Sequence, residues 1–153
     1  QLDNLDTKEV FFGFTDIDPN TLSIETDVMT GGTATLTLTA SDICGFFLSA
    51  ELTDDEDWHM VYNGGTTTGE TTSTSVDADD DAVAGEWQVL RLEIDTNGTA
   101  RWYIDGVLKQ TKTGAASTSV NMALILGVEA KGAAIENLDV DYLLVQANRD
   151  WTV

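Results

Sequence analysis

Apolar and polar residues alternate along residues 86–111, and this alternation predicts antiparallel sheet. Successive side chains of a strand point to opposite faces, so a spacing of two places the apolar residues together on one face. The alternating apolar positions are Leu90, Leu92 and Ile94 in a first strand and Ala100, Trp102 and Ile104 in a second. We therefore expect this face to be covered by a second layer of structure.

Two short turns divide this stretch into three strands. Asn97-Gly98 and Asp105-Gly106 are typical of type I′ hairpin turns, in which both residues need a positive φ. The segment is thus predicted to be a three-stranded meander. Trp102 and Ile104 should lie in the core, and Tyr103 should point to the opposite face.

The remaining segments also predict strands. Short apolar or alternating runs are separated by turn residues about every ten positions, and no segment keeps a helical period. The fold class is therefore all-β, a two-sheet antiparallel β-sandwich with few or no helices. Further strands are expected at residues 10–14, 33–39, 45–51, 58–63, 70–76, 122–129 and 137–146, with acidic loops at 53–57 and 77–81.

The charge balance limits the kinds of partner. The chain has 153 residues, which fits a single domain over 1–153, and it carries 27 acidic against 7 basic residues, a formal net charge of −20. The basic residues are scattered, so binding to nucleic acid or to an anionic membrane is disfavoured. Such acidity also keeps a protein soluble. Adaptation to salt and binding of divalent cations remain alternative explanations.

Complete catalytic motifs are not found in the sequence. Cys44 lies among apolar neighbours, which is typical of a small buried residue, and His59 has neither a second histidine nor a nucleophile motif beside it. Two carboxylate motifs of glycosidase type are incomplete: Glu93-Ile-Asp-Thr-Asn-Gly98 lacks the final Glu, and Glu51-Leu-Thr-Asp-Asp-Glu56 has Thr53 where the central Asp belongs. We therefore expect a protein that is not an enzyme.

Five motifs follow one another along the chain. They are Gly13-Phe-Thr-Asp16, Gly45-Phe-Phe47, Trp87 with Leu90-Arg-Leu-Glu-Ile-Asp95, Trp102-Tyr-Ile-Asp-Gly106 and Val140-Asp-Tyr142. In this order they resemble the concanavalin A-like lectin/glucanase superfamily, and within it a group of bacteriophage structural proteins. The resemblance spans residues 9–149. Its Tyr-Ile-Asp-Gly element also occurs in laminin G-like domains, and no strand and loop precede Glu9 as in longer members.

The resemblance implies a jelly-roll fold and a non-catalytic structural protein on the particle surface of a tailed phage. Such a protein would be a capsid decoration or cement protein or a fibre-associated module. Its partners would be capsid or other virion proteins, in a homo-oligomer or in symmetry-related copies. Gln1 is then expected to be an internal start, so that the chain is the C-terminal part of a longer parent.

Two alternatives remain open. A lectin-like module that binds host glycans would use surface aromatics, for which Trp58 and Trp151 are the candidates, while Trp87 fits either core or surface. A glucanase-like hydrolase is a more distant third, given the incomplete carboxylate pairs.

No cofactor is certain, and a structural Ca²⁺ is the one candidate. The resemblance implies Asp141 as a ligand. Asp79 and Asp81 offer carboxylates in the second acidic loop, which lacks EF-hand spacing.

Overall fold

The structure is a computed structural model that describes residues 1–20, 22–133 and 135–147. It is an all-β protein built from antiparallel sheets, with short helices only, as the sequence predicts. No helix in these residues is long and apolar enough to cross a membrane. The elements are β1 (Lys8–Thr15), η1 (Ile24–Val28), β2 (Met29–Gly32), β3 (Thr35–Leu38), β4 (Ile43–Ser49), β5 (Asp57–Asn63), α1 (Ser73–Val76), β6 (Asp77–Asp81), β7 (Leu90–Ile94), β8 (Ala100–Ile104), β9 (Val107–Lys112) and β10 (Ala123–Ala130).

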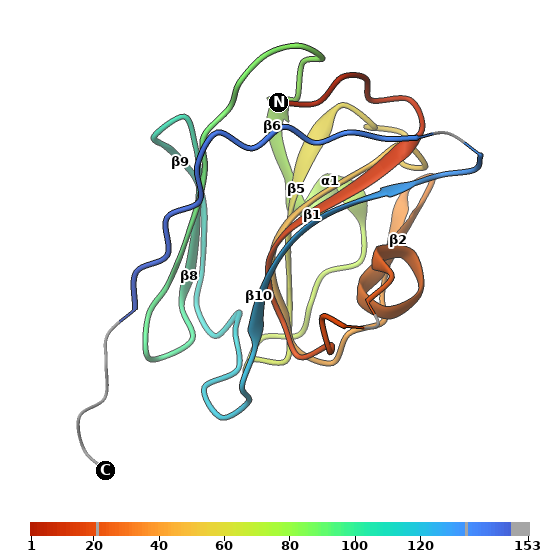
Figure 1. Cartoon of the computed structure of the whole chain (residues 1–153). Coiled ribbons are helices and arrows are strands. Elements are labelled where there is room, and N and C mark those ends of the chain that lie inside the picture. The colour runs from red at the N-terminus through yellow and green to blue at the C-terminus, as the bar shows by residue number, and fades with distance from the viewer. Residues whose placement is uncertain (21, 134, 148–153) are drawn as a thin grey trace.

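The largest sheet has five strands in the order β10-β1-β4-β5-β6, and all of its pairings are antiparallel. β1 lies between β4 and β10, so Val10 faces Leu48 on one side and Val128 on the other. Figure 1 shows this sheet in the middle of the molecule, with β2 and η1 on one side and the hairpin of β8 and β9 on the other. The sheet therefore has two faces with different coverings.

One face of the five-stranded sheet is fully covered. Phe11 of β1, Phe47 of β4 and Val61 of β5 have no exposed surface. They belong to one core cluster with residues of η1 and of the β2–β3 hairpin, such as Val28 and Met29. The burial of these large side chains is the main stabilising contribution on this face.

The opposite face is contacted by the three-stranded sheet of β7, β8 and β9. Its meander and its face assignment are confirmed, because Trp102 is 0% and Ile104 1% exposed whereas Tyr103 is half-buried on the other side. The Asp105-Gly106 turn has positive φ at both residues, as a type I′ turn requires. At Asn97-Gly98 only the glycine has a positive φ, so that turn is not of type I′.

Three predicted segments differ from the structure. Residues 70–76 do not form a strand, and α1 occupies their end because Val76 is buried against the sheet. The expected acidic loop at 77–81 is β6, an edge strand, where charged side chains can point to water. Residues 137–146 form one isolated bridge, from Leu138 to Leu2, because this part of the chain bonds to the N-terminus instead of to a strand.

Candidate functional site

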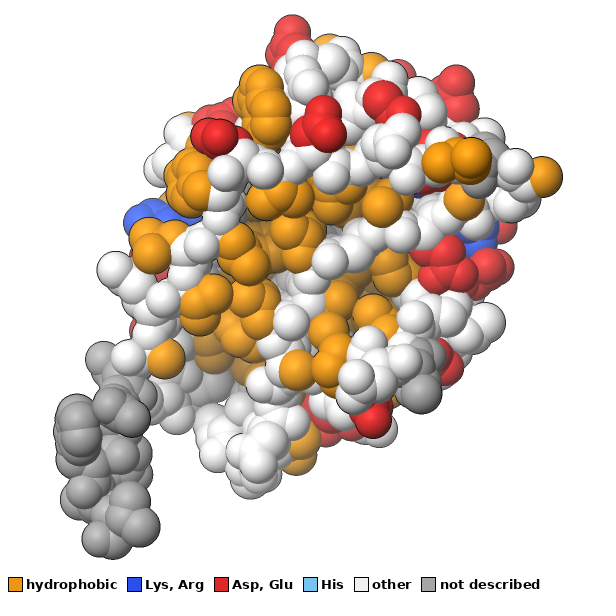
Figure 2. Space-filling model, viewed as in Figure 1, with side chains coloured by type: hydrophobic (Ala, Val, Ile, Leu, Met, Phe, Trp, Pro, Cys, Tyr) orange, Lys and Arg blue, Asp and Glu red, His pale blue; other side chains and the backbone are white. Residues whose placement is uncertain are grey.

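The residues that the structure describes form an apolar groove of about 1410 Å³. It lies between the five-stranded sheet, β7 and the segment that follows residue 135, and Figure 2 shows it as an apolar hollow on this face. We call it the terminal groove. The side chains that line it include Phe12 and Phe14 of β1, Leu90, Leu92 and Ile94 of β7, and Leu124 and Leu126 of β10.

The groove exists because the two sheets differ in width. Neighbouring strands are about 4.8 Å apart, so three strands cover roughly 10 Å less than five strands do. The three-stranded sheet lies over β4 and β5, where Phe46 and Tyr62 are buried. Phe12 and Phe14 on β1 and the side chains of β10 beyond them are only partly covered. Apolar sheet surface is therefore left accessible.

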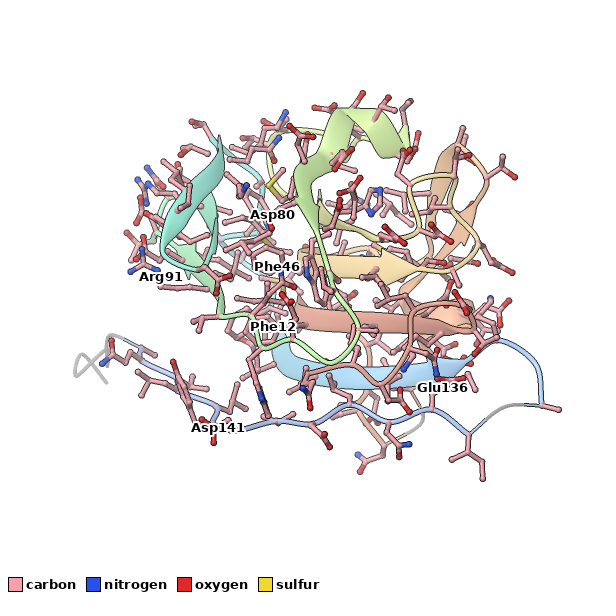
Figure 3. All side chains as sticks on the ribbon, turned by 90° about the horizontal axis from the view of Figure 1, so that it is seen from above. Phe12, Phe46, Asp80, Arg91, Glu136 and Asp141 are labelled. Carbon is pink, nitrogen blue, oxygen red and sulfur yellow. The ribbon has the colours of Figure 1, made fainter. Side chains whose placement is uncertain are left out.

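The segment after β10 forms the outer wall of the groove. Figure 3 looks down on this arrangement, with Arg91 on the three-stranded sheet, Phe12 on the five-stranded sheet and Asp141 on the terminal segment. Residues 138–147 line the groove, but they belong to no strand. Their apolar side chains are therefore more accessible than those of a packed strand would be. The most exposed are Val140, Tyr142, Leu143, Leu144 and Val145, at 50–70%.

The tryptophans are placed differently from the expectation. Trp58 was expected at the surface, but this is wrong: it is 5% exposed, and its Nε1–H donates to Gln88 Oε1 at 2.9 Å. Its ring meets Phe46 edge-on at 6.3 Å, so it packs in the core at the floor of the groove. Trp87 also lines the groove, and its side chain is 56% exposed. Trp151 lies outside the described residues.

Trp87 could not be assigned to core or surface from the sequence. It follows Glu86 and precedes Gln88, and this polar context was its only signal. In the structure it lies before β7 begins at Leu90, so no strand pairing turns its ring inward. It is the functional candidate that the sequence left undecided.

The proposed metal ligands lie on different elements. Asp141 is exposed on the terminal segment, whereas Asp79 and Asp81 lie on β6. Asp79 has φ of 50°, and its backbone N–H donates to Asp77 Oδ1 at 2.7 Å. Within the part of the chain that the structure describes, no three His, Cys, Asp or Glu side chains converge as a metal site would require.

A pair of carboxyl groups lies across β5 and β6. Asp57 faces Asp81, and His59 faces Asp77. Burial raises the pKa of Asp57 to about 7, and the carboxyl group of Asp81 and the charges of Asp77 and Asp54 add to this effect. Burial lowers the pKa of His59, whose two ring nitrogens are buried without a hydrogen-bond partner among the described residues. This pair lies outside the terminal groove.

The fully covered face contains a buried acid that has a structural role. Glu9 is 0% exposed, and it accepts hydrogen bonds from Ser49 Oγ at 3.0 Å and from the Gly31 backbone N–H at 3.3 Å. Burial raises the pKa of Glu9. Lys131 Nζ lies 2.7 Å from Glu25, 3.2 Å from Glu51 and 3.6 Å from Glu9. These contacts fix η1 and β2 to the end of β10.

Glu93, which belongs to the incomplete glycosidase motif at β7, bonds to side chains of its own sheet. Glu93 lies beside Arg91 at 3.3 Å and accepts a hydrogen bond from the Tyr103 hydroxyl at 3.0 Å. Arg91 in turn stacks over the Tyr103 ring at 3.8 Å. These three residues belong to the face of the three-stranded sheet that points away from Leu92 and Ile94.

Cys44 is buried in β4, as expected, and burial raises the pKa of its thiol. No protein-family model, curated protein or solved structure matches this chain.

Proposed function

We propose that this chain is a non-catalytic binding module that acts by protein–protein contacts through the terminal groove. The observation that carries the proposal is the apolar face left beside the three-stranded sheet. Soluble monomers rarely expose a large continuous apolar surface unless it serves as an interaction site. One edge of β7 has no strand neighbour in the described part of the chain, and its backbone groups can bond to an extended partner segment.

We place this module on the surface of a tailed-phage particle, as a capsid decoration or cement protein or a fibre-associated module. This placement rests on the sequence motifs that resemble phage structural proteins. The finer fold that we propose is the jelly-roll sandwich of that superfamily. The antiparallel sheets and the contact of Trp102 with Gly45 support it.

The charge of the chain limits the kinds of partner that can bind in the groove. With a net charge of −20, the module repels acidic surfaces and nucleic acid. The residues that line the groove include the acidic Glu86, Asp95 and Asp139. The partner is therefore an extended segment of another virion protein with apolar side chains for the groove and basic side chains for its acidic residues.

Carbohydrate binding is the second candidate, and the exposure of Trp87 favours it. An exposed indole beside Glu86 and Gln88 offers an apolar platform with polar neighbours. In this alternative the platform is Trp87, because Trp58 is buried.

The test uses occupancy on purified particles. The variant Leu92→Glu places a charge in the groove, and Leu108→Glu places the same charge on exposed β9 outside it. We expect Leu92→Glu to lose at least tenfold in occupancy while Leu108→Glu binds as the wild type does. Circular dichroism confirms that both variants fold.

Equal occupancy of the two folded variants would exclude the groove as the docking site. Glycan binding that is lost in Trp87→Ala, in the absence of particle binding, would establish the lectin alternative. Either result is read at a fixed salt concentration, because charge repulsion is screened by salt.

A further inference from the structure

The segment after β10 is fixed at its start. Glu136 Oε2 lies 3.0 Å from the ammonium group of Lys8, and the Thr7 hydroxyl donates to the same carboxylate. The backbone N–H of Asp139 donates to the carbonyl of Gln1 at 2.9 Å, beside the bridge of Leu138 to Leu2. Residues 136–139 are therefore held against the N-terminus of the chain.

Residues 140–147, which we call the strap, are held by no such contact. Among the described residues, none of them forms a hydrogen bond or ion pair with another part of the chain. The strap nevertheless has five large exposed apolar side chains in eight positions. Burying these side chains would stabilise the protein by about 25 cal/mol for each Å² of apolar surface removed from water.

An apolar surface against which these side chains can pack lies directly beside the strap. In Figure 1 the segment runs across the top of the molecule and then down alongside the three-stranded sheet. Leu90, Leu92 and Ile94 of β7 are half-buried and line the same groove as the strap. One edge of β7 has no neighbouring strand among the described residues.

The length and the charge of the strap suit packing on β7 in the terminal groove. Eight extended residues span about 26 Å, at about 3.3 Å per residue, and the five residues of β7 span about 16 Å. Asp141 is the only charged residue of the strap, so the strap adds little repulsion to the acidic residues of the groove. Its anchor at Asp139 lies at the groove itself.

We propose that the strap closes over the terminal groove of its own chain, packs on β7, and must be displaced before a partner can bind. This inference rests on the proposed function, since it describes the regulation of the same groove. An attached segment has an effective concentration in the millimolar range. A second copy would have to bring another chain of net charge −20, so the strap of the same chain is the favoured occupant.

The first test measures access to the groove in the full chain with Nile red, an uncharged dye that fluoresces on apolar surface. The strap variant replaces Tyr142, Leu143, Leu144 and Val145 by Ser, all of which are exposed, so its core is unchanged. A control variant carries Val107→Ser and Leu108→Ser on β9, outside the groove. We expect a severalfold rise in fluorescence for the strap variant and no rise for the control.

The second test adds a synthetic peptide of residues 139–147. It should bind the strap variant and displace the dye, and it should not bind the wild type, whose groove is occupied. Equal dye fluorescence of wild type and strap variant, or equal binding of the peptide to both, would overturn the proposal. A wild-type dimer that the strap variant cannot form would also overturn it, and would assign the groove to a second copy.

Particle occupancy separates this inference from the proposed function. If both hold, the strap variant binds particles more tightly than the wild type, because competition is removed. If the groove is the docking site but the strap does not close it, Leu92→Glu still abolishes occupancy while the strap variant binds as the wild type does. If only the proposed function fails, the dye and the peptide respond as expected and no variant changes particle binding.

Discussion

The indole Nε1–H of Trp102 in β8 donates a hydrogen bond of 2.7 Å to the backbone carbonyl of Gly45 in β4. Gly45 faces Gly13 of β1, and a Cβ on Gly45 would lie 2.9 Å from the Cα of Gly13 and 2.6 Å from the Phe12 carbonyl oxygen. The two glycines therefore allow the backbones of β1 and β4 to approach closely beneath the indole. This contact joins the three-stranded sheet to the five-stranded sheet.

Replacing Trp102 by Ala should destabilise the protein by about 3–5 kcal/mol, because a fully buried aromatic is lost and a cavity remains. Trp102→Phe should cost less, since it keeps most of the apolar contact and removes the hydrogen bond. Chemical denaturation gives both values. Trp87→Ala is the control, and as an exposed site it should change the free energy of unfolding by about 0.5 kcal/mol or less. A loss under about 1 kcal/mol for Trp102→Ala would contradict its place in the core.

Ionisation of Asp57 should make stability fall as pH rises. Its pKa is about 7 in the folded protein against an ordinary value of 3.8, so between these values the folded state binds more protons than the unfolded state. The corresponding contribution is present below about pH 4 and is lost progressively up to about pH 7. Asp57→Asn should therefore show a smaller fall in Tm between pH 5 and pH 8 than the wild type.

Glu56→Gln is the matched control for this prediction. It removes the same charge from the same acidic loop, but Glu56 is exposed. Its Tm should follow the wild-type dependence on pH. Parallel pH profiles for wild type and Asp57→Asn would refute the raised pKa.

Lys8 should contribute strongly to stability, although its side chain carries a charge that burial removes from water. It is 0% exposed, and its ammonium group lies 2.5 Å from Asp3 and 3.0 Å from Glu136. Lys8→Met leaves Glu136 without its cation, and removal of one partner of a buried ion pair costs about 3 kcal/mol or more. Arg91→Met breaks the exposed pair with Glu93 and should cost under about 1 kcal/mol. Urea denaturation distinguishes the two, and equal small losses would contradict the anchoring role of Lys8.

Added salt should raise the thermal stability of this chain. Its net charge of −20 produces self-repulsion, and the Debye length falls from about 30 Å at 0.01 M to about 8 Å at 0.15 M. The Tm should therefore rise with NaCl over this range. At equal ionic strength, a much larger rise with CaCl₂ would indicate a specific site, for which Asp79, Asp81 and Asp141 are the residues to replace.

The regular core of the fold could be predicted from local sequence. Alternation of apolar residues gave the faces of β8, because one side of that strand is completely buried and the other is not. Asp105-Gly106 formed the expected turn, since both residues tolerate a positive φ. Asn97 differs because the turn there is a longer loop, in which the Asp95 N–H donates to the Thr99 carbonyl and the Gly98 N–H donates to the Asp95 carbonyl.

Other features depend on contacts that are distant in sequence. β6 is rich in Asp and was expected to be a loop, but the burial of Ala78 and Ala82 and the free edge of β5 make it a strand. The groove could not be predicted, because it results from the difference in width between two sheets. Trp58 was assigned to the surface because an acidic loop precedes it, whereas its side chain points to the core.

The position of β1 between β10 and β4 has a consequence for how the chain folds. β1 pairs on one edge with β4 and on the other with β10. Lys8 of β1 pairs with Ala130 of β10, which is 122 residues further along the chain. Such distant pairing slows folding, because loop closure must precede the contact. During synthesis the β10 edge of β1 stays open until residues 123–130 have been made. An open apolar edge is prone to aggregation, so the yield of soluble protein should depend on the rate at which the last strand arrives.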